Sequence, residues 1–272
     1  MRSVKRRMAF YLFFVFLLIG VSILAPSLVP NDPYATQALY RKGAPVFQYP
    51  FGTDKLGRCI FSRVLMGTRT SVFSALMVVM TSMAAGTALG MAAGYYGGIF
   101  ERFIMSICDI FLAFPQMVLA IGVAGLLGGT MTNAMIALAL TGWTSYARLA
   151  RGLVLGIKKE SYISAARLSG EGGLQLMAVH ILPGIAGELI VNGSLQIGTV
   201  MMGFAGLSYL GLGVSVPEAE WGSMINEAVG YMQQAPWAVL APGAALFITV
   251  FIFQMLGDSL RDYFGVRRER YE

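Results

Sequence analysis

Residues that could carry out chemistry are few and scattered in this 272-residue chain. There is one histidine, His180, and there are two cysteines, Cys59 and Cys108. A single histidine cannot hold a metal without partners, and two cysteines cannot form a zinc cage or a disulfide framework. The 17 methionines are typical of apolar packing rather than of soft-metal binding. These residue types predict neither a resident metal nor a bound cofactor.

Motifs for nucleotide hydrolysis and for acyl or peptide hydrolysis are also missing. The sequence contains no G-x-x-x-x-G-K-[ST] phosphate loop, no H-E-x-x-H and no G-x-S-x-G. The chain is therefore not expected to be an enzyme, and any ATP-driven step must take place on another polypeptide.

The elements around these residues are strongly apolar. Apolar residues make up 56% of the chain, charged residues only 12%, and the mean hydropathy is +0.66. Soluble domains carry about 25% charged residues, so half that share cannot cover a water-facing surface. The composition predicts an integral membrane protein. The net charge of +6 is then explained by topology and by anionic lipid contact, and nucleic-acid binding is not expected.

Six apolar segments are long enough to cross a bilayer as helices, which requires about 20 residues each. They span residues 8–29, 71–95, 103–127, 131–153, 185–206 and 237–257. With the N-terminus inside, 14 of the 20 Lys and Arg residues fall in cytoplasmic segments and 6 in the region 31–70. We therefore predict an all-α polytopic membrane protein with six transmembrane helices and both termini in the cytoplasm.

Acidic residues inside these spans are scarce. Asp109 and Glu188 are the only ones, and both lie near a predicted membrane end. Self-powered carriers usually place ionisable groups near the bilayer midplane. We therefore expect an external driving force, with a self-contained secondary transporter or channel, or a membrane scaffold, as the alternatives.

The cytoplasmic segment 159–183, here called the coupling loop, is predicted to form two short helices. Gly170 can adopt a positive φ and end the first one. Leu174, Met177, Ala178 and Ile181 give the second an apolar stripe, and Pro183 is expected to turn the chain back to the membrane. Such a bent pair could occupy a groove of another protein or lie on the membrane surface.

The pattern A-A-x-x-x-G followed by H-I-L-P in this loop resembles the EAA loop of importer-type ABC permeases. In that family the loop docks into a cleft of a cytoplasmic ATPase. Ser164 stands where the motif usually has Glu, and Glu160 is the acid that could replace it. The resemblance implies ATPase-coupling roles for Glu160, Tyr162, Ser164, Ala165, Ala166, Arg167, Gly170, Leu174, His180 and Pro183.

Five further blocks resemble the second, "C"-type permease of peptide and nickel importers. They are FGTDKLGRCIFSRVLMGTRTSV (51–72), GYYGG (94–98), DIFLAFP (109–115), LSYLGLGVSVPEAEWGSMINEA (207–228) and LGDSLRDYF (256–264). The resemblance implies a heterodimer with a homologous permease in the bacterial plasma membrane. It also implies two cytoplasmic ABC ATPases that bind ATP and Mg, and an extracytoplasmic solute-binding protein. The cargo stays open between nickel, another metal chelate, a dipeptide and an oligopeptide.

The same resemblance divides the chain into functional regions. Residues 1–30 form a cytoplasmic tail and an extra first helix, 31–70 an extracytoplasmic segment, 71–257 a five-helix core, and 258–272 a cytoplasmic tail. Within the core, residues 207–236 form a gate loop, whose alternative role is a structural cap. Gate or binding-protein contacts are expected of Leu210, Gly211, Leu212, Gly213, Glu218, Glu220 and Trp221. In the extracytoplasmic segment, Asp54, Arg58 and Arg63 are expected to belong to a folded surface loop held by its own salt bridges.

Overall fold

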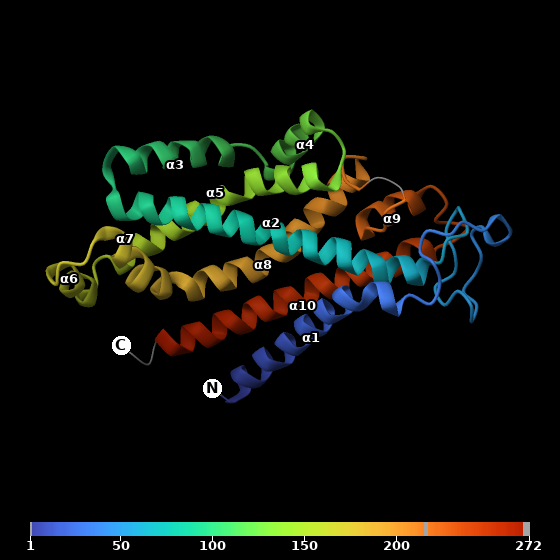
Figure 1. Ribbon diagram of the computed structural model, residues 1–272, viewed down its shortest axis with the longest axis horizontal. Helices are drawn as coiled ribbons and strands as arrows, with labels where there is room; N and C mark the ends of the chain where they lie inside the picture. Colours follow the sequence, from blue (N-terminus) through green and yellow to red (C-terminus); the bar gives the residue numbers. More distant parts are fainter. Residues whose placement is uncertain (1, 215–216, 269–272) are drawn as a thin grey trace.

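Long apolar helices form the body of the molecule in a computed structural model that describes residues 2–214 and 217–268 (Figure 1). The helices are α1 (Arg2–Leu28), α2 (Ile60–Tyr96), α3 (Gly98–Leu112), α4 (Gln116–Leu127), α5 (Met131–Ile157), α6 (Ser161–Leu168), α7 (Gly173–Gln175), α8 (Leu182–Tyr209), α9 (Trp221–Val229) and α10 (Trp237–Arg268). A 3₁₀ turn covers Ala38–Tyr40, and a π-helical stretch, Leu176–Ile181, joins α7 to α8. The described residues contain no strand beyond two isolated bridges, which confirms the all-α prediction.

Four helical segments are long and apolar enough to cross a membrane on their own. They are Val4–Leu28, Ile60–Tyr96, Gly173–Tyr209 and Trp237–Gly265. Helices α3 and α4 together qualify as a fifth span, but the pair is bent by 89°. The 27-residue α5 does not qualify on its composition. The predicted number of six spans therefore stays a prediction.

The predicted span at 103–127 is not one continuous helix, because the chain bends between α3 and α4. Helix α3 ends at Leu112 and α4 begins at Gln116, directly after Pro115. A proline has no N–H to donate and disfavours helical geometry in the residue before it, here Phe114. Hydropathy averaged over 25 residues hides such a local stop.

Helix α2 begins at Ile60, eleven residues before the predicted span, and packs along α5. The first turns of α2 contain the buried Arg63. Because a charged residue lowers the local hydropathy, the sequence pattern assigns this part of the helix to a loop. The two helices approach closely at Gly86 and Gly90 of α2. A Cβ atom there would lie 2.3 Å from the carbonyl oxygen of Trp143 and 2.2 Å from that of Ala147. Only glycine permits this separation, since helix backbones cannot move aside cheaply.

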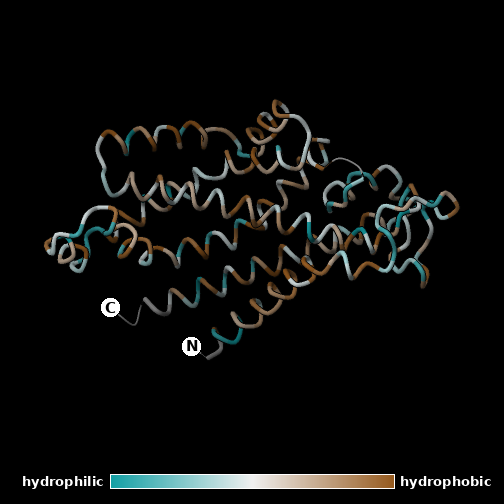
Figure 2. The backbone as a smooth tube through the Cα atoms, viewed as in Figure 1, coloured by the Kyte–Doolittle hydropathy of each residue, from teal (hydrophilic) through white to brown (hydrophobic). Residues whose placement is uncertain are grey.

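The polar segments gather at the two ends of the bundle. Figure 2 shows teal colouring around α6 at one end and around α9 with residues 30–59 at the other, with brown along the long helices. The start of α1 and the end of α10 lie toward the α6 end in Figure 1. Two separate regions therefore hold the residues singled out by the sequence.

Candidate functional site

The coupling loop is continuous with the longest apolar helices of the bundle. The π-helical stretch leads directly into α8, and the N–H of Leu182 donates to the carbonyl of Met177, five residues earlier. The predicted turn at Pro183 is wrong, because Pro183 lies in the first turn of α8. Proline lacks an N–H and its ring clashes with the carbonyl four residues earlier, and a π-helical widening relieves both conflicts.

A Schellman motif ends α6, as Gly170 predicts. The N–H of Gly170 donates to the carbonyl of Arg167 (3.1 Å), and the N–H of Glu171 donates to the carbonyl of Ala166 (3.3 Å). Gly170 has φ +88°, and a Cβ atom there would meet nothing within 4 Å. The glycine is therefore required by backbone geometry and not by lack of space.

One side of the coupling loop is packed against the bundle and the other is exposed. The buried side consists of Ile163, Leu176, Met177 and Ile181, which pack with Ala150, Val154, Ile185 and Leu189. Leu168 is 89% exposed and Leu174 is 76% exposed. The predicted apolar stripe of the second short helix is thus divided. Met177 and Ile181 are buried, and Leu174 and Ala178 are exposed. The other predicted coupling residues are exposed (Glu160, Tyr162, Ser164, Ala165, Arg167, Gly170 and Pro183) or half-buried (Ala166 and His180).

Cations and a tyrosine hold this loop in place. The Nζ of Lys158 donates to the carbonyl of Tyr95 (2.5 Å) and lies 5.4 Å from the centre of its ring. The guanidinium of Arg167 lies 5.8 Å from the same ring. Within the loop, the Nε2 of His180 is 2.9 Å from the Oε2 of Glu171. These contacts fix an exposed apolar surface at the α6 end of the bundle.

At the opposite end, Glu220 and Trp221 begin α9 inside the protein. The Glu220 carboxylate accepts from the N–H groups of Gly222 (2.8 Å) and Ser223 (2.7 Å), which caps the helix. The indole N–H of Trp221 donates to the carbonyl of Val64 on α2 (3.0 Å). Both residues are buried, so in this conformation they position the gate loop and are not available to touch a binding protein.

The other predicted gate residues lie closer to the surface, with one exception. Leu210, Gly211 and Glu218 are exposed, Leu212 is half-buried, and Gly213 is buried. A direct contact with a binding protein therefore stays a prediction for the exposed three.

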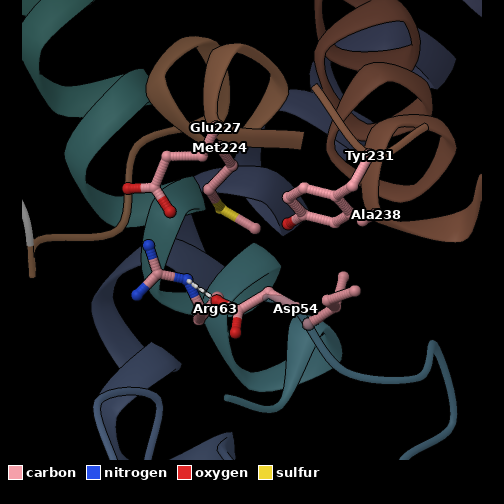
Figure 3. Close-up of a pocket in the computed structure, with 7 residues that line it drawn as sticks. Asp54, Arg63, Met224, Glu227, Tyr231 and Ala238 are labelled. Atoms are coloured by element: carbon pink, nitrogen blue, oxygen red, sulfur yellow. Dashed lines mark ion pairs between the residues drawn. The ribbon is translucent and has the colours of Figure 1, made fainter. Parts of the chain in front are cut away.

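A buried ionic cluster connects the gate loop to the segment 31–70. The Nε of Arg58 lies 2.5 Å from the Oδ2 of Asp54, and the Nη2 of Arg58 lies 2.6 Å from the Oε2 of Glu227 on α9. Arg63 approaches the same Asp54 oxygen (3.9 Å, Figure 3) and donates to the carbonyl of Pro217 (3.0 Å). The salt bridges predicted among Asp54, Arg58 and Arg63 are confirmed. Their predicted position in a surface loop is wrong, because all three residues are buried under the gate loop. Sequence reasoning missed Glu227, although the gate loop has acids and no basic residue while residues 31–70 have six basic ones.

Beside this cluster is a small pocket lined by Asp54, Ile60, Arg63, Met224, Glu227, Tyr231 and Ala238 (Figure 3). Its volume of about 10 Å³ suits a single water and no cargo. Burial and the neighbouring Asp54 raise the pKa of Tyr231 to about 12, so its phenol stays neutral at physiological pH. Among the described residues, no three His, Cys, Asp or Glu side chains group together as a metal site would require.

A family model, described as "Binding-protein-dependent transport system inner membrane component", matches residues 86–270. The chain is 43% identical over 251 residues to the glutathione transport system permease protein GsiD of Pectobacterium atrosepticum, covering 92% of this chain and 83% of that protein. It is 38% identical over 252 residues to the nickel transport system permease protein NikC of Escherichia coli K12, covering 93% and 91%. The dipeptide transport system permease protein DppC of Haemophilus influenzae is 39% identical over 259 residues, covering 92% and 87%.

The fold also resembles a solved structure. A chain of the MetNI methionine ABC transporter, in an inward-facing conformation, superposes with a TM-score of 0.55. The alignment covers 71% of this chain and 94% of that chain at 20% sequence identity. At that identity the similarity concerns the fold alone.

Proposed function

Because this chain belongs to the family of binding-protein-dependent transport system inner membrane components, we propose that it is one of the two permease subunits of a bacterial ABC importer. It lines half of a path across the plasma membrane, and ATP with Mg is bound and hydrolysed on separate cytoplasmic subunits. The exposed apolar surface of the coupling loop, fixed at one end of the bundle, is the observation that carries this proposal.

The coupling loop is suited to transmit force because it is built into a long helix. Residues Gly173–Tyr209 form a single helical segment of 37 residues, about 55 Å long at 1.5 Å per residue. Its far end contacts α9, where the side-chain amide of Asn226 donates to the carbonyl of Ser208 (3.3 Å). A displacement of the coupling loop by a closing ATPase would therefore reach the gate loop. Such a rigid-body shift would convert an inward-facing path into an outward-facing one.

The remaining partners follow from this arrangement. A homologous permease completes the path as a heterodimer, and an extracytoplasmic solute-binding protein delivers cargo at the gate loop. The start of α1 and the end of α10 lie toward the coupling loop, which supports cytoplasmic termini (Figure 1). Exposed aromatic residues of α1 and α10, such as Phe13, Phe16 and Phe247, are suited to contact lipid.

The cargo proposed is a small peptide or a nickel chelate. The names of the relatives cover glutathione, nickel and dipeptide at 38–43% identity. Similar identity to permeases of three cargoes indicates that the permease does not by itself determine the choice. The binding protein is the component expected to determine it.

Reconstitution into liposomes tests this function. The chain alone is expected to move no cargo, and uptake is expected only with the sister permease, both ATPases, the binding protein and ATP. As a control, ATPases lacking the phosphate-binding lysine should abolish uptake without preventing assembly. Flux of a dipeptide or of nickel through the purified chain alone would instead establish a channel or secondary transporter.

A further inference from the structure

Helices α3 and α5 carry an ion pair that faces outward. The Nη2 of Arg148 lies 2.5 Å from the Oδ1 of Asp109, and the two side chains are 51% and 69% exposed. Arg148 precedes the end of α5 at Ile157 by nine residues, about 13 Å along the helix. Asp109 follows the start of α3 at Gly98 by eleven residues, about 16 Å.

In the predicted six-span arrangement, in which residues 131–153 cross the membrane, these lengths place the pair within it. The 27 residues of α5 extend about 40 Å, roughly 10 Å more than the hydrocarbon thickness. Even if the whole excess protruded at the coupling-loop end, Arg148 would still lie about 3 Å inside the hydrocarbon region. Asp109 is its ion-pair partner and shares this depth.

Lipid is an unsuitable neighbour for this pair. Charged side chains within membrane spans face the interior of the bundle or a water-filled cavity, because hydrocarbon cannot solvate them. In hydrocarbon the attraction between the two charges is strong, but the cost of taking both out of water can exceed it. The face that bears Arg148 and Asp109 must therefore meet water or another polar surface.

The rest of α5 is consistent with this conclusion. Alone among the long helices, α5 is not apolar enough to count as a span. One turn beyond Arg148, the next exposed position on its face is Gly152, which presents no apolar side chain to lipid. A groove of about 380 Å³ between α2 and α5 lies along the first half of α5 and is lined in part by Trp143, whose ring contacts that of Phe111. Further from the pair, α5 exposes Ile136 and Leu140, so the polar part of its exposed face is confined to the half that bears Arg148.

We propose that the α5 face bearing Arg148, together with Asp109 of α3, lines the water-filled part of the translocation path. The inference rests on the proposed permease function and adds to it the residues that meet the hydrated cargo. Because Asp109 and Arg148 belong to different helices, their ion pair also holds α3 against α5 at the wall of the path.

Thiol labelling of the assembled importer in liposomes tests this assignment. In a Cys59→Ser, Cys108→Ala background, cysteines are introduced in separate variants at Asp109, Arg148 and Gly152. Gly152 keeps the ion pair intact, lies on the same face as Arg148, and has free space around its Cβ. The matched control is Phe103→Cys, which is also exposed but lies about 120° around α3 from Asp109.

A charged, membrane-impermeant thiosulfonate applied from the coupling-loop side is expected to label the three path positions at least about tenfold faster than position 103, because the reactive thiolate forms in water and not in hydrocarbon. Equal, slow labelling at positions 148, 152 and 103 would overturn the proposal. ATP-dependent uptake by the background complex is measured in the same liposomes. Uptake with slow labelling refutes only the path lining, whereas absent uptake refutes the permease function itself.

Discussion

Replacing Gly170 by valine is expected to reduce ATP-dependent uptake by the reconstituted importer about tenfold while leaving assembly intact. Gly170 holds φ +88° in the Schellman motif that ends α6. An L-residue there costs about 1–2 kcal/mol, and β-branched valine tolerates this region least. Since about 1.4 kcal/mol corresponds to a factor of ten, a shift of that size depopulates the docked geometry of the coupling loop. Uptake and the stoichiometry of the purified complex are measured together.

Gly172→Val is the matched control for this substitution. Gly172 lies two residues away and is also exposed, and a Cβ atom there would likewise meet nothing within 4 Å, but its φ of −71° suits any residue. Its valine variant should keep nearly normal uptake. Equal uptake by the Gly170 and Gly172 variants would show that the helix end has no part in coupling.

Removal of the Arg58 guanidinium is expected to destabilise the extracytoplasmic end by about 3–5 kcal/mol. Arg58 is 1% exposed and contacts both Asp54 and Glu227. In Arg58→Met the two carboxylates would remain buried with their main cationic partner gone, and uncompensated buried charge is far more costly than the loss of a surface pair. The measurement is the shift of the denaturant midpoint of the detergent-solubilised chain.

Arg41→Met provides the control, because Arg41 lies in the same segment and is exposed. Its effect should remain below about 1 kcal/mol, as for surface charges generally. An Arg58→Met midpoint within that small range would contradict the view that the cluster joins residues 54–63 to α9. A double variant, Arg58→Met with Glu227→Gln, should recover part of the loss by removing one of the orphaned charges.

Structural features that depend only on neighbouring residues can be predicted from the sequence. The apolar segments form helices, since a buried or lipid-facing backbone must satisfy its own hydrogen bonds. Gly170 ends α6 through a motif that involves only six consecutive residues, 166–171. Asp54 and Arg58 pair at a separation of four residues, within reach of a sequence argument.

Contacts between residues that are far apart in the chain could not be predicted from the sequence. Glu227 pairs with Arg58 across 169 residues, and Trp221 donates to Val64 across 157. The residues next to Glu227 and Trp221 in the sequence do not indicate these distant partners. For the same reason the sequence could not show that some of the expected gate residues are buried. From the sequence alone, Pro183 predicts a turn. The π-helical stretch before it allows the helix to accommodate a residue without an N–H, but the composition of that stretch does not reveal its π-helical geometry.

The proposed function depends on the binding of a cytoplasmic ATPase to the coupling loop. Its most direct test is a Leu168→Cys crosslink in the assembled complex, using the Cys59→Ser, Cys108→Ala background and a short bifunctional thiol reagent. Leu168 is exposed on α6, and the control position, Phe47, is also strongly exposed. Phe47 belongs to the segment 30–59, which lies at the opposite end of the bundle (Figure 1). We predict a crosslink from position 168 to the ATPase, strengthened when ATP is bound, and none from position 47. A cysteine at 168 that reacts with an impermeant reagent from the extracytoplasmic side, or that never joins the ATPase in a complex active for uptake, would contradict the claim.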